Sequence, residues 1–276
     1  MKKFVLLTAA VCLTSVAFGQ NASSSLIDEY ECIYEYQVKN TKGSIDATST
    51  ILQIGRNTAK FSDYTTFQVD SAIACKAPEA DIQKFKAQET RNDILFDQSV
   101  SQNEPKGKLT VYSVITPNYY SYTESATPIN WKLSEETDTI CGYTCQKAVG
   151  EYGGRTWTVW YSSEIPVSFG PWKLCGLPGL VLAANDADNI HQFKAITFRK
   201  SNTPMNLKPY TNTINISREQ FIKAKNKFEI DPMGNIPGEA ISEMSVQKFD
   251  NGEYKTLVNG VVVRVRPNGY VPLELK

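Results

Sequence analysis

Alternating apolar and polar positions dominate the first part of the chain. Tyr30 to Lys39 is rich in Tyr, Ile and Val, and Ser44 to Ile54 alternates with a period of two residues. That period places successive side chains on opposite faces of a strand. Gly43 lies between the two runs as a turn residue, so we expect an antiparallel hairpin followed by a short strand at Thr58 to Ser62.

Two segments depart from this alternation and predict helices. Phe67 to Glu89 is poor in glycine and carries apolar residues at helical spacing, with Pro78 placed where a helix can begin. Ser217 to Phe228 is expected to be a short helix, because Ser217 and Gln220 have the spacing of a capping box.

The rest of the chain returns to short alternating runs. Gly153-Gly154 predicts the tight turn of a hairpin, and Asn185 to Asn189 predicts the turn of another. The further expected strands are Lys108–Thr116, Tyr119–Glu124, Trp131–Ser134, Cys145–Tyr152, Arg155–Tyr161, Leu180–Ala184, Gln192–Arg199 and Val261–Val265. Such spacing favours a mainly β (α+β) fold, a curved antiparallel sheet or half-barrel covered by one or two helices.

The N-terminus has the pattern of a secretory signal peptide. Lys2 and Lys3 precede an apolar run from Phe4 to Ala17, and Ala17 and Gly19 are the small residues of a cleavage site. We therefore expect residues 1–19 to be a signal peptide and residues 20–276 to form one β-rich domain in the periplasm or outside the cell. Cys12 follows Val11, which is too bulky for a lipobox, so a lipid anchor is not expected.

Composition excludes some partners. The chain has 29 basic and 29 acidic side chains, and removal of Lys2 and Lys3 with the leader leaves 27 against 29. A balanced surface of this kind gives no general attraction to nucleic acid. Beyond the leader, no apolar run approaches the roughly 20 residues of a membrane span. We therefore expect a protein that neither binds nucleic acid nor spans the membrane after cleavage.

Five cysteines remain after cleavage, and their state is open. Export makes disulfides plausible, and an odd number leaves at least one thiol unpaired. The sequence does not decide the pairing and equally allows inert thiols. With one histidine in the chain, a zinc site would need nearly all the cysteines, so we expect no metal and no cofactor. The five are Cys32, Cys75, Cys141, Cys145 and Cys175.

One run of sequence resembles a known family. Residues 137–148 (TDTICGYTCQKA) are followed by 160–167 (WYSSEIPV), by Gly170-Pro171-Trp172, and by 176–181 (GLPGLV). This order is similar to the hallmark run of the GLPGLI family of secreted bacterial proteins, with Val181 in place of the final Ile. The resemblance covers about residues 137–198. It implies a signal-bearing, envelope-located, β-rich protein and no particular reaction.

The glycines and prolines of this run indicate a structural role. Glycine tolerates backbone conformations with positive φ, and proline fixes φ near −65°. We therefore interpret Gly170, Pro171, Gly176, Leu177, Pro178 and Gly179 as a structural motif. The order of elements also resembles the half-barrel of periplasmic lipoprotein carriers. That analogy implies a concave apolar face, closed by the Phe67–Glu89 helix, that can bind a hydrophobic ligand.

An aromatic cluster is the candidate ligand site. Its side chains can line a groove, as aromatic residues often do, or they can anchor the long loop onto the sheet. A period of two favours the core interpretation, since it places Trp157 and Tyr161 on one strand face and Trp160 on the other. The cluster comprises Trp157, Trp160, Tyr161, Phe169 and Trp172.

Catalytic and metal patterns find little support. A calcium loop counted from Asp186 would need Gly and Glu where His191 and Thr197 stand. The nucleophile-elbow, zincin and phosphate-loop patterns do not occur. Two function classes follow. The first is a non-catalytic envelope protein that binds a hydrophobic small molecule or an outer-membrane partner. The second is an enzyme with a thiol-based site, such as Cys175 with His191.

Overall fold

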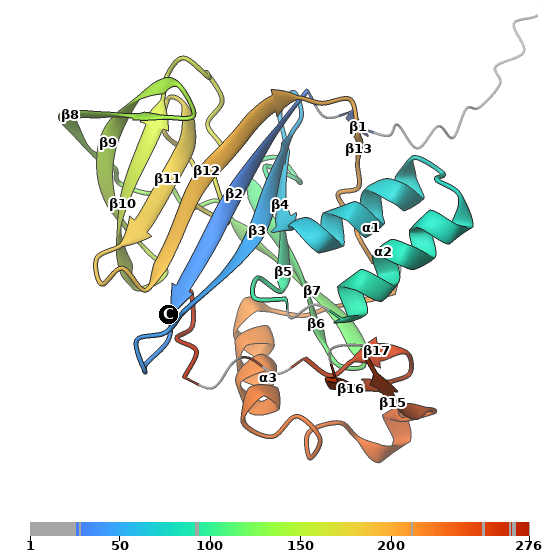
Figure 1. Ribbon diagram of the computed structural model, residues 1–276. Coiled ribbons are helices and arrows are strands. Elements are labelled where there is room, and N and C mark those ends of the chain that lie inside the picture. Colours follow the sequence, from blue (N-terminus) through green and yellow to red (C-terminus); the bar gives the residue numbers. More distant parts are fainter. Residues whose placement is uncertain are drawn as a thin grey trace, which may run out of the picture.

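The computed structural model describes residues 26–27, 29–91, 94–210, 212–249, 252–264, 266 and 269–275. Within them the chain forms one twelve-stranded sheet, two small sheets and three α-helices (Figure 1). The expected mainly β fold with a curved antiparallel sheet is therefore confirmed. The expected signal peptide, residues 1–19, lies outside the described residues.

The large sheet consists of two meanders, each built from strands that follow one another along the chain. They meet where β2 pairs with β12, the first strand of one meander beside the last strand of the other. The first meander is β2 (Tyr30–Lys39), β3 (Ile45–Ile54), β4 (Ala59–Asp63), β5 (Gln98–Gln102), β6 (Lys108–Ile115) and β7 (Asn118–Ser125). The second is β8 (Lys132–Ile140), β9 (Tyr143–Tyr152), β10 (Arg155–Ser162), β11 (Leu180–Asp186) and β12 (His191–Lys200).

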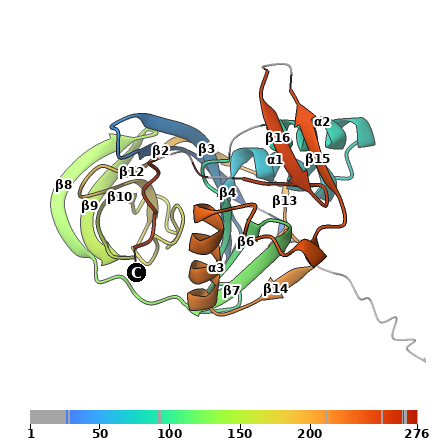
Figure 2. The same cartoon turned by 90° about the horizontal axis from the view of Figure 1, so that it is seen from below.

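The second meander curls into a half-barrel (Figure 2). At one end the tip of the β8–β9 hairpin reaches β12, where the Cys141 thiol donates to the carbonyl of Ala195 at 3.1 Å. Large side chains that are buried almost completely fill the concave face. They include Tyr34, Tyr36, Phe61, Trp157, Trp172 and Phe193. Their rings pack directly on one another, with 4.5 Å between the centroids of Tyr36 and Phe193.

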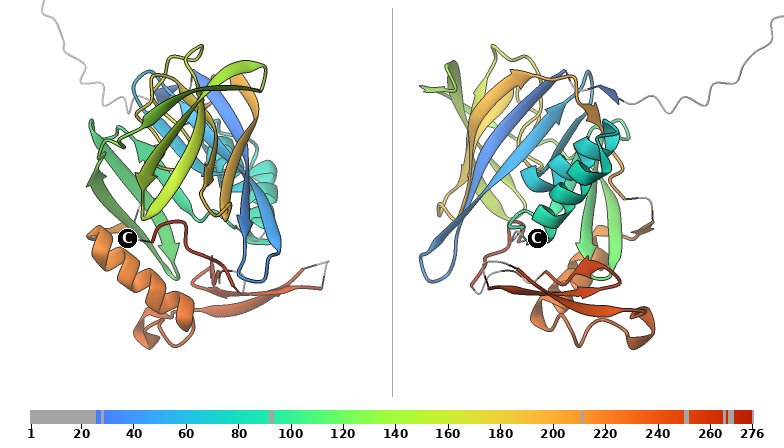
Figure 3. Two further views of the ribbon diagram at one scale, coloured as in Figure 1. Left: turned by 90° about the vertical axis from the view of Figure 1, so that its left-hand side faces the viewer. Right: turned by 45° about the vertical axis from the view of Figure 1, so that its right-hand side comes forward.

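The helices cover both faces of the sheet. The expected single helical segment is two helices, α1 (Tyr64–Ala74) and α2 (Glu79–Arg91). The break falls at Pro78, which has no N–H to continue a helix, and at Lys76, whose φ is +52°. Both lie outside the half-barrel (Figure 3, right), where Asp70 of α1 pairs with the buried Lys60 at 2.7 Å.

The third helix, α3 (Arg218–Ile230), lies on the concave side of the sheet at its β6–β7 end. Its N-terminus has the expected capping box, in which Ser217 accepts from the amide of Gln220. Phe221 packs its ring against Tyr122 of β7, with 5.2 Å between the centroids. α3 and the aromatic side chains therefore fill the concave face together.

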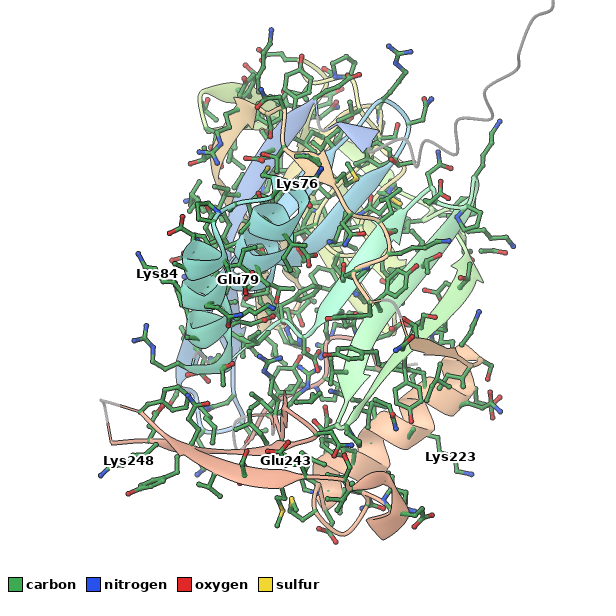
Figure 4. The ribbon with its side chains drawn as sticks, turned by 90° about the vertical axis from the view of Figure 1, so that its right-hand side faces the viewer. Lys76, Glu79, Lys84, Lys223, Glu243 and Lys248 are labelled. Carbon is green, nitrogen blue, oxygen red and sulfur yellow. The ribbon has the colours of Figure 1, made fainter. Side chains whose placement is uncertain are left out.

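Several short strands were not expected from the sequence. β14 (Thr213–Asn215) pairs in parallel with β7, and β1 (Leu26–Ile27) pairs with β13 (Pro204–Met205). β15 (Met244–Lys248), β16 (Tyr254–Val258) and β17 (Val261–Val262) form a separate sheet that projects from the molecule (Figure 4). The expected strand Val261–Val265 is thus shortened to β17, and Val265 itself lies outside the described residues.

The described helices offer no membrane span, because none combines the length and the apolar character that crossing a bilayer requires.

Candidate functional site: a charged cavity beneath the C-terminal strap

The segment between β10 and β11 bends toward the interior of the half-barrel, and Trp172 and Lys173 lie in this bend. The side-chain amide of Gln102 donates to the carbonyls of Gly170 and Trp172, each at 2.7 Å. Trp172 has a φ of +55°, which a bulky residue rarely adopts. The two hydrogen bonds from β5 hold this turn and place Trp172 and Lys173 in the interior, where both are buried.

Two glycines of the structural motif have no room for a side chain. A Cβ at Gly170 would lie 2.2 Å from the carbonyl oxygen of Leu174, and one at Gly179 would lie 2.2 Å from that of Ser162. These are backbone contacts, so relief would require a shift of the main chain. Gly170 and Gly179 are therefore glycines because of close packing.

The rest of the motif is packed onto the half-barrel. The amides of Leu180 and Val181 donate to the carbonyls of Ile165 and Phe169. Leu177 and Pro171 are buried, whereas Gly176, with a φ of +94°, and Pro178 are exposed. These hydrogen bonds thus attach the start of β11 to the loop that precedes it.

The five aromatic residues of the candidate ligand site do not line one groove. Trp157, Tyr161 and Trp172 are buried in the core, and Trp160 and Phe169 are partly exposed. The rings of Trp157 and Trp172 pack at 5.8 Å between centroids. Of the five, Trp172 contributes to the cavity described below.

A first charge network surrounds Lys173. Its ammonium group is fully buried and lies 2.6 Å from Glu124 and 3.2 Å from Glu274. Arg218 of α3 pairs with the same two carboxylates, at 3.4 Å and 2.7 Å. Burial alone would lower the pKa of Lys173, but Tyr122 and the two carboxylates outweigh it and raise that pKa above its ordinary value. Lys173 is therefore a fixed cation rather than a base.

A second network lies beside the first. Asp97 pairs with Lys225 of α3 and with Arg266, the latter at 2.9 Å, and Glu229 pairs with Arg266 at 2.8 Å. Burial alone would raise the pKa of Asp97, but Arg266 and Lys225 outweigh it and lower the pKa to about 2. Like the first network, this one joins two cations to two carboxylates, so their charges balance.

Residues 269–275, the C-terminal strap, run across the concave face (Figure 2). The guanidinium of Arg155 donates to the strap carbonyls of Pro272 and Leu273 and also pairs with Asp186 at 2.6 Å. The amide of Leu275 donates to the carbonyl of Gly153 at 2.7 Å. The strap is thus held at its backbone by the β9–β10 turn and at Glu274 by Lys173 and Arg218.

Between the strap, α3 and the sheet lies a cavity of about 70 Å³. Its apolar wall is aromatic and aliphatic, and comprises Tyr122, Trp172, Phe221, Tyr270 and Leu273. Its polar wall comes from the two charge networks and includes Lys225, Glu229, Arg266 and Glu274. Apolar walls with a few polar groups are typical of small-molecule sites, although this cavity is smaller than most of them.

His191 lies in the core close to the strap. Its Nδ1 is 2.9 Å from the hydroxyl of Tyr36, its ring lies edge-on to Tyr270, and its Nε2 is buried with no described hydrogen-bond partner. Burial, with Arg155 as the next largest cause, lowers the pKa of His191 to about 3. His191 is therefore neutral at physiological pH and pairs with Tyr36, not with a thiol.

All five cysteines among the described residues are free thiols, so the disulfide alternative finds no support. Cys32 and Cys145 are buried, Cys175 is half-buried, and Cys75 and Cys141 are exposed. Burial raises the pKa of both Cys145 and Cys175 to about 11. Thiols with raised pKa are poor nucleophiles at neutral pH, because the thiolate is the reactive form.

A family model described as the N-glycanase peptide, N-terminal domain, matches residues 121–218. That match spans the second meander, from the end of β7 to the start of α3. No sequence among the curated proteins matches the chain.

Two solved structures share the fold. They are crystal structures of PNGF-II in space groups P21 and C2, with TM-scores of 0.53 and 0.54 and 17% identity to this chain. Each alignment covers 82% of this chain and 39% of PNGF-II, so the chain spans well under half of that protein. A LolA superfamily protein from Nitrosomonas europaea is more distant, with a TM-score of 0.28, 7% identity, and coverage of 67% of this chain and 90% of that one. The PNGF-II likeness shows that this chain has the fold of one part of a longer protein.

Proposed function

We propose that this chain is an exported, non-catalytic binding protein whose concave face accepts a hydrophobic group when the C-terminal strap moves aside. The observation that carries the proposal is the cavity under the strap. One of its walls is an irregular segment held by side chains and by the β9–β10 turn, whereas its other walls are the sheet and α3. Export is the expectation from the leader. Membership of the GLPGLI family remains part of the proposal and rests on residues 137–198.

The composition of the concave face supports a hydrophobic ligand. The side chains beneath the strap are aromatic and almost completely buried, and Trp172 and Leu273 meet at the cavity. Burial of apolar surface is the main favourable term in binding such a group, at roughly 25 cal/mol per Å². The strap fills this space in the structure, so a ligand larger than the cavity competes with it.

The charges near the site support binding over catalysis. Glu124, Glu274, Asp97 and Glu229 each pair with a cation, and Lys173 and Arg266 are held as permanent cations. A general base needs a pKa near the working pH, and His191 has a pKa of about 3. The same reasoning weakens the thiol-based alternative, since burial raises the pKa of Cys175 to about 11.

An outer-membrane partner is the second candidate, and the β15–β16 hairpin favours it. Met244, Val246 and Tyr254 are exposed there by 58%, 64% and 63%. Apolar side chains gathered on a projecting hairpin suit contact with another protein.

The first candidate is tested with cis-parinaric acid, whose fluorescence rises in an apolar site, and with native mass spectrometry of the purified chain. Arg155→Lys keeps the pair with Asp186 but loses the forked bonds to the strap carbonyls. We expect this variant to bind the probe several-fold more tightly than the original chain. The matched control is Arg199→Lys, because Arg199 pairs with Glu31 on the opposite face of the sheet. Absence of probe binding and of co-purified lipid in both the original chain and Arg155→Lys would contradict the proposal.

A further inference from the structure

A second hollow lies on the opposite, convex side of the sheet, away from the strap. It has a volume of about 730 Å³, within the range of ligand pockets. Its wall is the segment 204–208, which runs beside the end of α1, and Glu104-Pro105 closes another side. Figure 4 views this side of the molecule, with α1 and α2 beside the strands of the first meander. The convex face carries this groove independently of the proposed function.

The register of the strands explains what lines the floor of the groove. Ser101 of β5, Thr110 of β6 and Thr123 of β7 are cross-strand neighbours and form one row. Tyr112 and Ser121 form the next row, and Asn215 of β14 extends it. Residues opposite one another on adjacent strands share a face, and rows two residues apart repeat along it. The floor is therefore a lattice of hydroxyl groups from adjacent strands.

These hydroxyls are only partly used within the chain. Thr110 donates to the carbonyl of Glu104 at 2.8 Å and lies 3.1 Å from the hydroxyl of Thr123. Ser101 donates to the carbonyl of Leu207 at 3.2 Å. Among the described residues, no hydrogen bond engages the hydroxyl of Tyr112 or of Ser121. A hydroxyl can donate one hydrogen bond and accept two, so the floor keeps both donors and acceptors for a ligand.

The floor is neutral, and charge is confined to the rim. Glu104 and Lys208 line the groove with opposite signs. Glu104 contributes, after burial, to the raised pKa of Tyr112, so this phenol stays protonated and able to donate. A neutral floor of this kind gives no advantage to an anion or a cation.

Other ligand classes fit the groove less well. An acyl chain would leave the floor hydroxyls without partners, and unpaired buried polar groups cost free energy. An extended peptide that adds to a sheet needs a free strand edge, whereas β5 and β6, which carry Ser101, Thr110 and Tyr112 of the floor, are paired on both sides. The groove therefore favours a ligand that presents many neutral hydroxyl groups and apolar ring faces to the aromatic ring of Tyr112.

We propose that this groove binds a short neutral oligosaccharide. Tyr112 and Ser121 supply its free hydrogen-bonding groups, Asn215 lies at the end of their row, and the 204–208 segment forms its side wall. The proposal concerns binding only and includes no reaction step.

The test uses the full mature chain with a panel of neutral oligosaccharides of xylose, glucose, mannose and N-acetylglucosamine, followed by isothermal titration and amide chemical-shift mapping. We expect at least one of them to bind and to shift the amides of β6 and β7. Tyr112→Phe and Ser121→Ala should each weaken binding by about tenfold, the loss of one hydrogen bond. Tyr120→Phe is the matched control, since Tyr120 lies on β7 but faces the other side of the sheet, and it should leave affinity unchanged.

Two results would overturn the proposal. One is the absence of binding by every oligosaccharide at concentrations up to about 10 mM, the weakest affinity that such contacts would give. The other is binding that Tyr112→Phe and Ser121→Ala leave unchanged in chains whose thermal unfolding matches the original. A peptide or fatty acid that shifts the same amides, in place of a sugar, counts against it as well.

Discussion

His191 gives the molecule a pH dependence that belongs to one residue. Its pKa is about 3 in the folded chain and about 6.5 when unfolded, so between these values the unfolded state binds a proton that the folded state does not. Stability therefore falls as the pH falls through this window. Below about pH 6 we expect the free energy of unfolding to drop by about 1.4 kcal/mol for each unit of pH.

Urea unfolding between pH 5 and pH 6.5 measures this slope. The range lies above the window of Asp97, whose low pKa makes its stabilisation fade only below about pH 4. His191→Gln keeps a polar partner for Tyr36 without titrating, so it should lose the part of the slope that His191 supplies. Equal slopes for the two chains would show that His191 does not control the pH dependence.

At this scale the sequence predicted where side chains point better than what they pair with. The period of two placed Trp157 and Tyr161 on one face, as the structure has them. The partners of Lys173 were not predictable, because Glu124 and Glu274 come from distant parts of the chain. A lysine between Trp172 and Leu174 in an apolar run was the one available signal, since a buried lysine requires carboxylate partners.

The turn between β10 and β11 is an element whose shape depends on two glycines. Gly170→Ala and Gly179→Ala each push a Cβ against a backbone carbonyl at 2.2 Å, so we expect each to destabilise the chain by at least about 2 kcal/mol. Gly238→Ala is the control, because a Cβ at Gly238 meets no atom within 4 Å, and it should change stability by less than about 0.5 kcal/mol. Thermal unfolding by circular dichroism compares the three, and a similar loss in all of them would refute the packing argument.

Elements marked by strong local signals were predicted well. The β2–β3 hairpin follows from alternation around Gly43, the β9–β10 hairpin from Gly153-Gly154, and the start of α3 from its capping box. β5 and β15 were missed because their residues are mostly polar and alternate weakly. The division between α1 and α2 was missed although Pro78 marked it, because proline was interpreted as a start and not also as the end of an earlier helix.

At the scale of the whole molecule, Lys173 ties together parts that are far apart in sequence. It joins the run between β10 and β11 to Glu124 of β7 and to Glu274 of the strap, and Arg218 of α3 pairs with the same two carboxylates. Lys173→Met leaves two partly buried carboxylates with a single cation in place of the fully buried ammonium group, so we expect a loss of about 3 kcal/mol in urea unfolding. Lys147→Met removes an exposed pair with Glu136 and should cost less than about 1 kcal/mol. Equal losses in the two variants would mean that the network does not hold the molecule together.

The fold class was predictable from the sequence, but the pairing of strands that are distant in sequence was not. Short alternating runs indicated a curved antiparallel sheet, whereas the pairing of β2 with β12 joins residues 30–39 to 191–200 and has no local signature. The filling of the concave face by α3 and the strap was likewise unpredictable, because it depends on tertiary packing.

The pairing of β2 with β12 has a consequence for assembly. Within each meander, every strand pairs with a strand that is near it in sequence. The pairing of β2 with β12, in contrast, closes a loop of about 150 residues, and such long-range contacts form slowly during folding. We therefore expect the pairing of β2 with β12 to form after the hairpins within each meander. If the chain is cut in the link at residues 126–131, we expect the two halves to reassociate through the pairing of β2 with β12.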